Sequence, residues 1–152
     1  WMEEEVISKR TGRRVGYAIT IALNIGFLVI VVNLVSWGWF PWLTEEFDDV
    51  VPYIVLSVAG TMAVNAAYLF YDPPWFKSLT ELGTLVLSLV ATVRMLQVFP
   101  FDFSAYDFAW GTLARWILAV AIFGMSIGMI AHLAKLIRFG RDAVEEGKQA
   151  EI

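Results

Sequence analysis

Two arginines stand inside apolar stretches of this sequence, on either side of an acidic loop. Arg94 and Arg115 each interrupt an apolar run, and Asp102 and Asp107 lie in the segment between them. A charge at the centre of a membrane segment costs roughly 3 kcal/mol on insertion scales. Such a charge needs a polar partner, water or an anion. These four residues are therefore candidates for a ligand or ion site, or for polar ties between helices.

Asparagines form a second group of polar residues within apolar stretches. Asn24 and Asn33 lie in the first stretch and point to nearly opposite sides of a helix, while Asn65 shares a face with Thr61 and Tyr68 in the second. Buried amides can bond across helices or line a polar path through the membrane. A first helix that is polar on two sides should be packed on both, by its own bundle and by another subunit.

Small residues follow one face of the last apolar stretch. Gly124 and Gly128 form a G-x-x-x-G motif, Ala121 lies on the same face, and His132 continues it. This spacing permits close helix approach. Packing within the chain and packing between subunits both remain open.

The composition bounds the function. The 152 residues are 59% hydrophobic, contain no cysteine and include one histidine, which fits a single transmembrane domain over 1–152. Thiolate metal sites, iron–sulfur clusters and multi-histidine sites within one chain are excluded. We expect no metal, no cofactor and no nucleic-acid partner. No catalytic motif occurs, so we also expect that the protein is not an enzyme.

Four apolar stretches predict transmembrane helices over about 15–40, 52–71, 79–98 and 108–137. Pro52 suits a first helical turn, and Pro100 should end the third helix. Ser78 and Glu81 have the spacing of a capping box, which predicts the start of that helix. Gly140 should stop the fourth.

Charges set the orientation. Nine of the eleven lysines and arginines fall on one side of a four-span chain. The other side has none and carries six acids: Glu45, Glu46, Asp48, Asp49, Asp102 and Asp107. The positive-inside rule places both termini in the cytoplasm. The predicted fold is all-α, an up-down four-helix transmembrane bundle, and we expect it in a plasma (inner) membrane.

This orientation separates the two arginines. Helical side chains lean toward the N-terminus of their helix, so Arg115 leans outward and can reach headgroups or Asp107. Arg94 leans into the bilayer and needs Asp102, Asp107, Gln97 or a polar group on another helix. It acts either as a clamp between helices or as a contact for an anion, a lipid phosphate or a water-filled vestibule.

Together these features predict a small polytopic membrane protein without enzymatic activity. We expect a homo-oligomer or a subunit of a larger membrane complex, in contact with membrane lipids, which could form a pore or an outer vestibule. The alternative is a small transporter, or a protein that binds lipid or an anion through Arg94 and Arg115.

Overall fold

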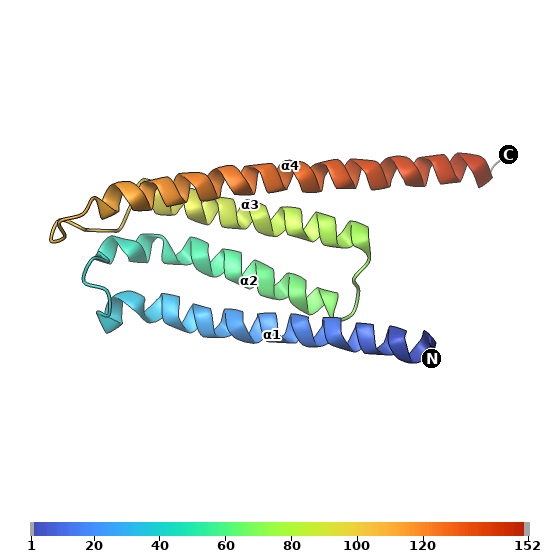
Figure 1. Cartoon of the computed structure of the whole chain (residues 1–152), viewed down its shortest axis with the longest axis horizontal. Coiled ribbons are helices and arrows are strands. Elements are labelled where there is room, and N and C mark those ends of the chain that lie inside the picture. Colours follow the sequence, from blue (N-terminus) through green and yellow to red (C-terminus); the bar gives the residue numbers. More distant parts are fainter. Residues whose placement is uncertain (1, 151–152) are drawn as a thin grey trace.

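The structure, a computed structural model, describes residues 2–150 and is all-helical in its long elements (Figure 1). Its elements are α1 (Met2–Trp37), the 3-10 turn η1 (Glu45–Asp49), α2 (Val51–Tyr68), α3 (Pro74–Val98) and α4 (Trp110–Ala150). The predicted all-α class with four long helices is confirmed. Each of the four is long and apolar enough to cross a membrane.

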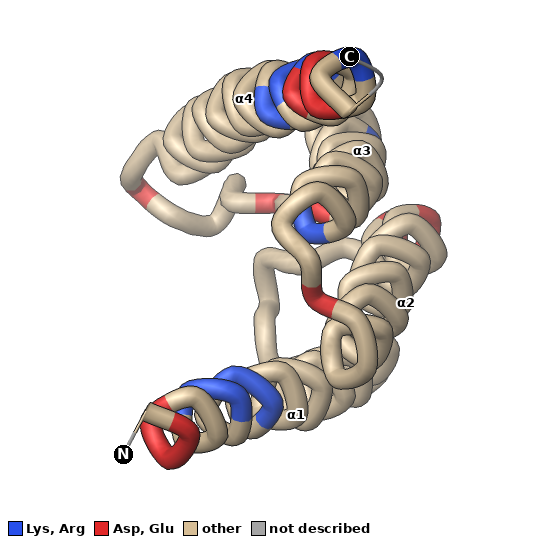
Figure 2. The backbone as a smooth tube through the Cα atoms, turned by 90° about the vertical axis from the view of Figure 1, so that its right-hand side faces the viewer, with Lys and Arg blue, Asp and Glu red and all other residues tan. Residues whose placement is uncertain are grey.

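The four helices pack in sequence order as an open row. α1 packs on α2, α2 on α3 and α3 on α4, whereas no contact within residues 2–150 joins α1 to α4. Figure 2 shows the row end-on, with α1 and α4 as its two edges. Accordingly, Val31 is the one buried residue of α1, and no residue of α4 is buried.

The row has two distinct ends. The N- and C-termini lie at one end, where α1 and α4 project beyond the 69–73 connection (Figure 1). We call this the termini end. The opposite end holds the 38–50 and 99–109 segments, and we call it the loop end. Apart from Arg94 and Arg115, the lysines and arginines gather toward the termini end, on α1, α3 and α4 (Figure 2).

Helix α1 begins earlier than the sequence predicted. The charged lead is helical from Met2, so the predicted start at residue 15 is wrong. Glutamates fill the first turn, where they complement the helix dipole, and Lys9 Nζ lies 2.6 Å from Glu5 Oε1 one turn away. The helix ends at Trp37 because Gly38 takes a left-handed conformation, with φ of 63°.

Helix α3 also begins earlier than predicted. Pro73 is extended and Pro74 opens the helix, since proline fits a first helical turn. The predicted capping box is therefore wrong: Ser78 lies inside the helix and is buried. The predicted end at Val98, just before Pro100, is confirmed.

Helix α4 does not stop where the sequence predicted. It continues through Gly140 to Ala150, and its 41 residues span about 60 Å. The glycine is tolerated because a helix-interior glycine costs only about 1 kcal/mol, and the residues beyond it are mostly good helix formers. The predicted stop at residue 137 is wrong.

The two loop-end segments pair with each other. Leu43 and Phe101 form an isolated antiparallel bridge, in which Thr44 N donates to Pro100 O at 2.9 Å and Asp102 N donates to Trp42 O at 2.7 Å. The Trp42 ring lies 5.7 Å from that of Phe101, centroid to centroid. Hydrogen bonds and aromatic packing thus tie the α1–α2 connection to the α3–α4 connection.

Candidate functional site

Arg94 joins α3 to α2 near the loop end. Its side chain is half-buried, and the guanidinium carbon lies 5.2 Å from the centre of the Tyr53 ring. Its Nη1 donates a long hydrogen bond, 3.3 Å, to Gln97 Oε1. The buried Nε–H finds no acceptor among residues 2–150. Arg94 therefore faces the neighbouring helix, and among the partners considered from sequence Gln97 makes the polar contact.

Arg115 packs on Phe99, the residue that follows the end of α3. Its guanidinium carbon lies 4.5 Å from the centre of the Phe99 ring. Phe99 is left-handed, with φ of 45°, and this conformation turns the chain out of the helix. A cation over an aromatic face contributes roughly 0.5–1 kcal/mol at an exposed site. Arg115 thus has a packing role at a strained position.

The two aspartates between α3 and α4 lie on the surface of their loop. Asp102 and Asp107 are both exposed in the 99–109 segment. Asp102 Oδ1 accepts a hydrogen bond from Ser104 N at 2.9 Å. Hydrogen bonds from the Ser104 hydroxyl and amide lower the pKa of Asp102 below its ordinary value. Within the described chain, neither acid forms an ion pair with Arg94 or Arg115.

The three asparagines bond to their own helices. Each amide nitrogen donates to the carbonyl four residues earlier, at 2.8 Å for Asn24, 2.7 Å for Asn33 and 2.8 Å for Asn65. The carbonyls are those of Thr20, Val29 and Thr61 respectively. This local bond satisfies one N–H of each amide and leaves its oxygen free to accept a bond from a partner.

A polar groove of about 500 Å³ opens across α1, α2 and α3 toward the termini end. The predicted shared face of Thr61, Asn65 and Tyr68 forms its α2 wall, while Thr20 comes from α1 and Glu81 from α3. The groove is open because α1 and α4, the two edges of the row, do not meet in the described structure. It combines hydroxyl, amide and carboxylate groups on one concave side.

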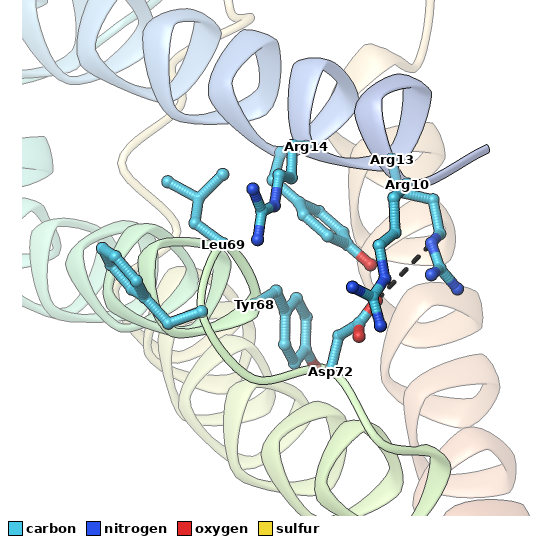
Figure 3. Close-up of a pocket in the computed structure, with 8 residues that line it drawn as sticks. Arg10, Arg13, Arg14, Tyr68, Leu69 and Asp72 are labelled. Carbon is cyan, nitrogen blue, oxygen red and sulfur yellow. Dashed lines mark ion pairs between the residues drawn. The ribbon is translucent and has the colours of Figure 1, made fainter. Parts of the chain in front are cut away.

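Beside the groove, a charged cluster ties three elements together (Figure 3). Arg13 Nε and Lys77 Nζ lie 3.6 and 3.7 Å from the same oxygen, Asp72 Oδ2. Lys77 Nζ also donates to the Tyr17 hydroxyl at 2.7 Å. The Tyr17 and Tyr68 rings are 5.3 Å apart, and the Tyr68 hydroxyl bonds to Thr80. These side chains connect α1 to α3 across the end of α2.

The small-residue face of α4 divides into two parts. A Cβ added at Gly128 would lie 3.3 Å from Leu85 Cδ1 of α3, so this glycine permits close packing within the chain. At Gly124 the same atom would meet nothing within 4 Å, and Ala121 is exposed. His132, further along, places Nδ1 3.2 Å from Glu81 Oε2, an ion-pair distance without hydrogen-bond alignment.

Sequence reasoning missed the α2–α3 seam. The hydroxyls of Ser57 and Ser88 bond to each other at 3.0 Å, and a Cβ at Gly60 would come within 2.6 Å of Leu87 Cδ1. The available signal was two small residues, Ser57 and Gly60, within an apolar stretch, because small residues allow helices in a membrane to approach closely. The pairing of Tyr17 with Lys77 had no local signal, because 60 residues separate them.

The groove and the charged cluster together provide polar and charged groups on one side of the helix row. The groove offers donors and acceptors, the adjacent cluster offers positive charge, and both lie toward the termini end. The chain matches no protein-family model, no curated protein and no solved structure.

Proposed function

We propose that the chain is a non-enzymatic, four-span integral membrane protein that assembles with further copies of itself. Both termini lie in the cytoplasm, and the membrane is a plasma (inner) membrane. Four helices of sufficient length and apolar character support insertion. The gathering of lysines and arginines at the termini end supports the orientation, because positive charge is retained on the cytoplasmic side.

One observation supports the proposed assembly: the row of four helices leaves one side of the polar groove uncovered. The groove hydroxyls of Thr20 and Thr61 already donate to carbonyls of their own helices. Lipid tails cannot bond to the Asn65 oxygen or to Glu81, however, and unsatisfied polar groups in hydrocarbon are costly. The two edges of the row, α1 and α4, are packed on one side only. A second copy in the same orientation supplies a matching edge and further polar groups.

A second copy fits better than an unrelated partner for a geometric reason. Closed symmetric assemblies join the same surface, or two complementary edges, of identical subunits. Here the exposed Ala121–Gly124 face of α4 permits close approach, and Asn33 on α1 has a free carbonyl oxygen. Joining edges also places groove residues inside the assembly, which then has a polar lining.

At the loop end, the same assembly gathers the acidic loops into an outer vestibule. Six acids lie there, and negative charge raises the local concentration of cations. A pore through the assembly would use this vestibule as its mouth. The alternative, a transporter or a protein that binds lipid or anions through Arg94 and Arg115, has less support, because an aromatic ring packs against each guanidinium.

The non-enzymatic assignment rests on composition. The chain has no cysteine nucleophile and a single histidine, and no Gly-rich phosphate loop or catalytic triad order occurs in it. The polar groups of the groove are those that bond helices and line aqueous paths.

The experiment is native mass spectrometry of the protein released from nanodiscs. The wild type should be a homo-oligomer, and the double variant Thr61→Val/Asn65→Leu should shift it toward monomer. Membrane hydrogen bonds average about 0.6 kcal/mol, so two lost bonds should weaken association roughly fivefold or more. Leu56→Met on the exposed side of α2 is the control and should not shift it. A monomeric wild type, or an equal shift in the control, would overturn the assembly. Conductance of the wild type in bilayers then separates a pore from an accessory subunit.

A further inference from the structure

We propose that the charged cavity beside the groove binds the phosphate of an anionic phospholipid in the cytoplasmic leaflet. This inference rests on the proposed orientation, which puts the termini end at that membrane surface. The cavity is small, about 140 Å³, and lies between the 10–17 part of α1 and the end of α2 (Figure 3). Its size suits a phosphate group.

Positive charge dominates this cavity. Arg10, Arg13 and Arg14 fall on one face of α1, at positions i, i+3 and i+4, and all three line it. Figure 3 shows their side chains extending from α1 toward Asp72 and the end of α2. Asp72 is the one acid of the lining, and its carboxylate is already shared by Arg13 and Lys77.

Two guanidinium groups are thus available for a ligand. Within residues 2–150, neither Arg10 nor Arg14 forms an ion pair with a carboxylate. Guanidinium groups bind phosphate oxygens through paired, charge-assisted hydrogen bonds. The Asp72 pair holds Arg13 in place, so the site is partly organised before the ligand binds.

The apolar rim favours a lipid over free phosphate. Leu69 and Phe70 line the cavity beside the arginines, and Phe70 is 89% exposed. A phenylalanine this exposed at the end of a spanning helix suits contact with acyl chains below the headgroup. Basic pockets between transmembrane helices on the cytoplasmic side are typical sites for anionic headgroups.

The experiment titrates purified full-length protein in neutral detergent with dioleoyl phosphatidylglycerol, dioleoyl phosphatidylcholine or inorganic phosphate. Native mass spectrometry counts the bound molecules. We expect saturable binding of phosphatidylglycerol, with phosphatidylcholine and phosphate at least tenfold weaker. Arg10→Gln/Arg14→Gln should weaken phosphatidylglycerol binding roughly tenfold or more, and Arg10→Lys/Arg14→Lys should retain part of it.

The matched control is Arg138→Gln/Arg141→Gln, which removes the same charge from an exposed part of α4 at the same end. It should leave the affinity within twofold. Equal losses in both double variants would replace the site with diffuse attraction, and phosphate binding as tight as lipid would replace the lipid with a free anion. Either result overturns the proposal, as does equal binding of the two lipids.

Thermal unfolding checks that the variants fold, and Arg14→Gln alone replaces a double variant that does not. A protein that binds phosphatidylglycerol as a monomer would refute the assembly and leave the lipid site standing.

Discussion

At the scale of single residues, each of the two arginines in apolar helices packs its guanidinium group against an aromatic ring. Arg94 contacts Tyr53 of another helix, and Arg115 contacts Phe99 at the end of the preceding one. The half-buried Arg94 also has a polar side-chain contact, with Gln97, whereas the exposed Arg115 has no such contact within the described residues.

We therefore predict that Arg94→Leu lowers stability more than Arg115→Leu. Loss of the Tyr53 and Gln97 contacts should cost roughly 1–2 kcal/mol, against at most about 1 kcal/mol for the exposed cation–π contact. Thermal unfolding in nanodiscs measures both. The double variant Arg94→Leu/Tyr53→Leu should cost less than the sum of its singles, because they share one contact. Equal effects of Arg94→Leu and Arg115→Leu would show that Arg94 is only an interfacial anchor.

Asp102 gives a prediction with a definite pH sign. Its bonds from Ser104 lower its pKa in the folded protein. The ionised Asp102 carboxylate therefore stabilises the folded protein above the ordinary aspartate pKa. This stabilisation is lost as the pH falls through the lower pKa of the folded state. Ser104→Ala removes the hydroxyl bond and should raise the pKa of Asp102, as followed by carboxyl NMR. An unchanged pKa would mean that the backbone amide alone sets it. Asp102→Asn is the control and should lack this titration.

At the scale of elements, packing against α3 differs along the small-residue face of α4. Gly128 lies close to Leu85, and Gly124 lies in open space. The sequence motif pairs these glycines, but the packing assigns them different surroundings.

We predict that Gly128→Leu destabilises the chain by roughly 1–3 kcal/mol, because the new side chain would overpack the α3–α4 contact. Gly124→Leu should leave the unfolding temperature of the monomer almost unchanged. If the exposed face joins subunits, Gly124→Leu should instead shift the oligomer toward monomer in native mass spectrometry. Equal destabilisation of the monomer by both variants would contradict the assigned packing.

At the scale of the whole molecule, charge separation between the two ends predicts the topology. The chain has no cysteine, so single introduced cysteines report without background. Cysteines replacing Glu46 and Ser104 should react with an impermeant thiol reagent from outside intact cells, since both lie at the loop end. Cysteines replacing Lys77 and Arg141 should react only after permeabilisation. Labelling of the Lys77→Cys or Arg141→Cys variant from outside would refute the four-span orientation.

The four apolar helices, the start of α2 near Pro52 and the end of α3 before Pro100 follow from local sequence alone. Runs of about 20 apolar residues and the prolines at 52 and 100 act locally, so their consequences can be read without the fold. The predicted end of the first helix at residue 40 is wrong, because α1 ends at Trp37, before the left-handed Gly38. Boundaries failed where the local signal was a statistical preference. Helix α3 begins at Pro74 and not at the predicted Ser78–Glu81 capping box. Helix α4 continues through Gly140 because charged, helix-forming residues follow it.

The three-dimensional packing determines which polar residues meet. Arg13 reaches Asp72, Lys77 reaches Tyr17, and Ser57 reaches Ser88 across intervals that no periodicity encodes. It also decided that α1 and α4, in the part of the chain described, stay apart, which leaves the polar groove open. The physical reason is that membrane-type helices are apolar nearly all round, so hydrophobicity does not specify which face meets which neighbour. Small residues, hydroxyls and paired charges decide that, and their effect depends on the three-dimensional partner.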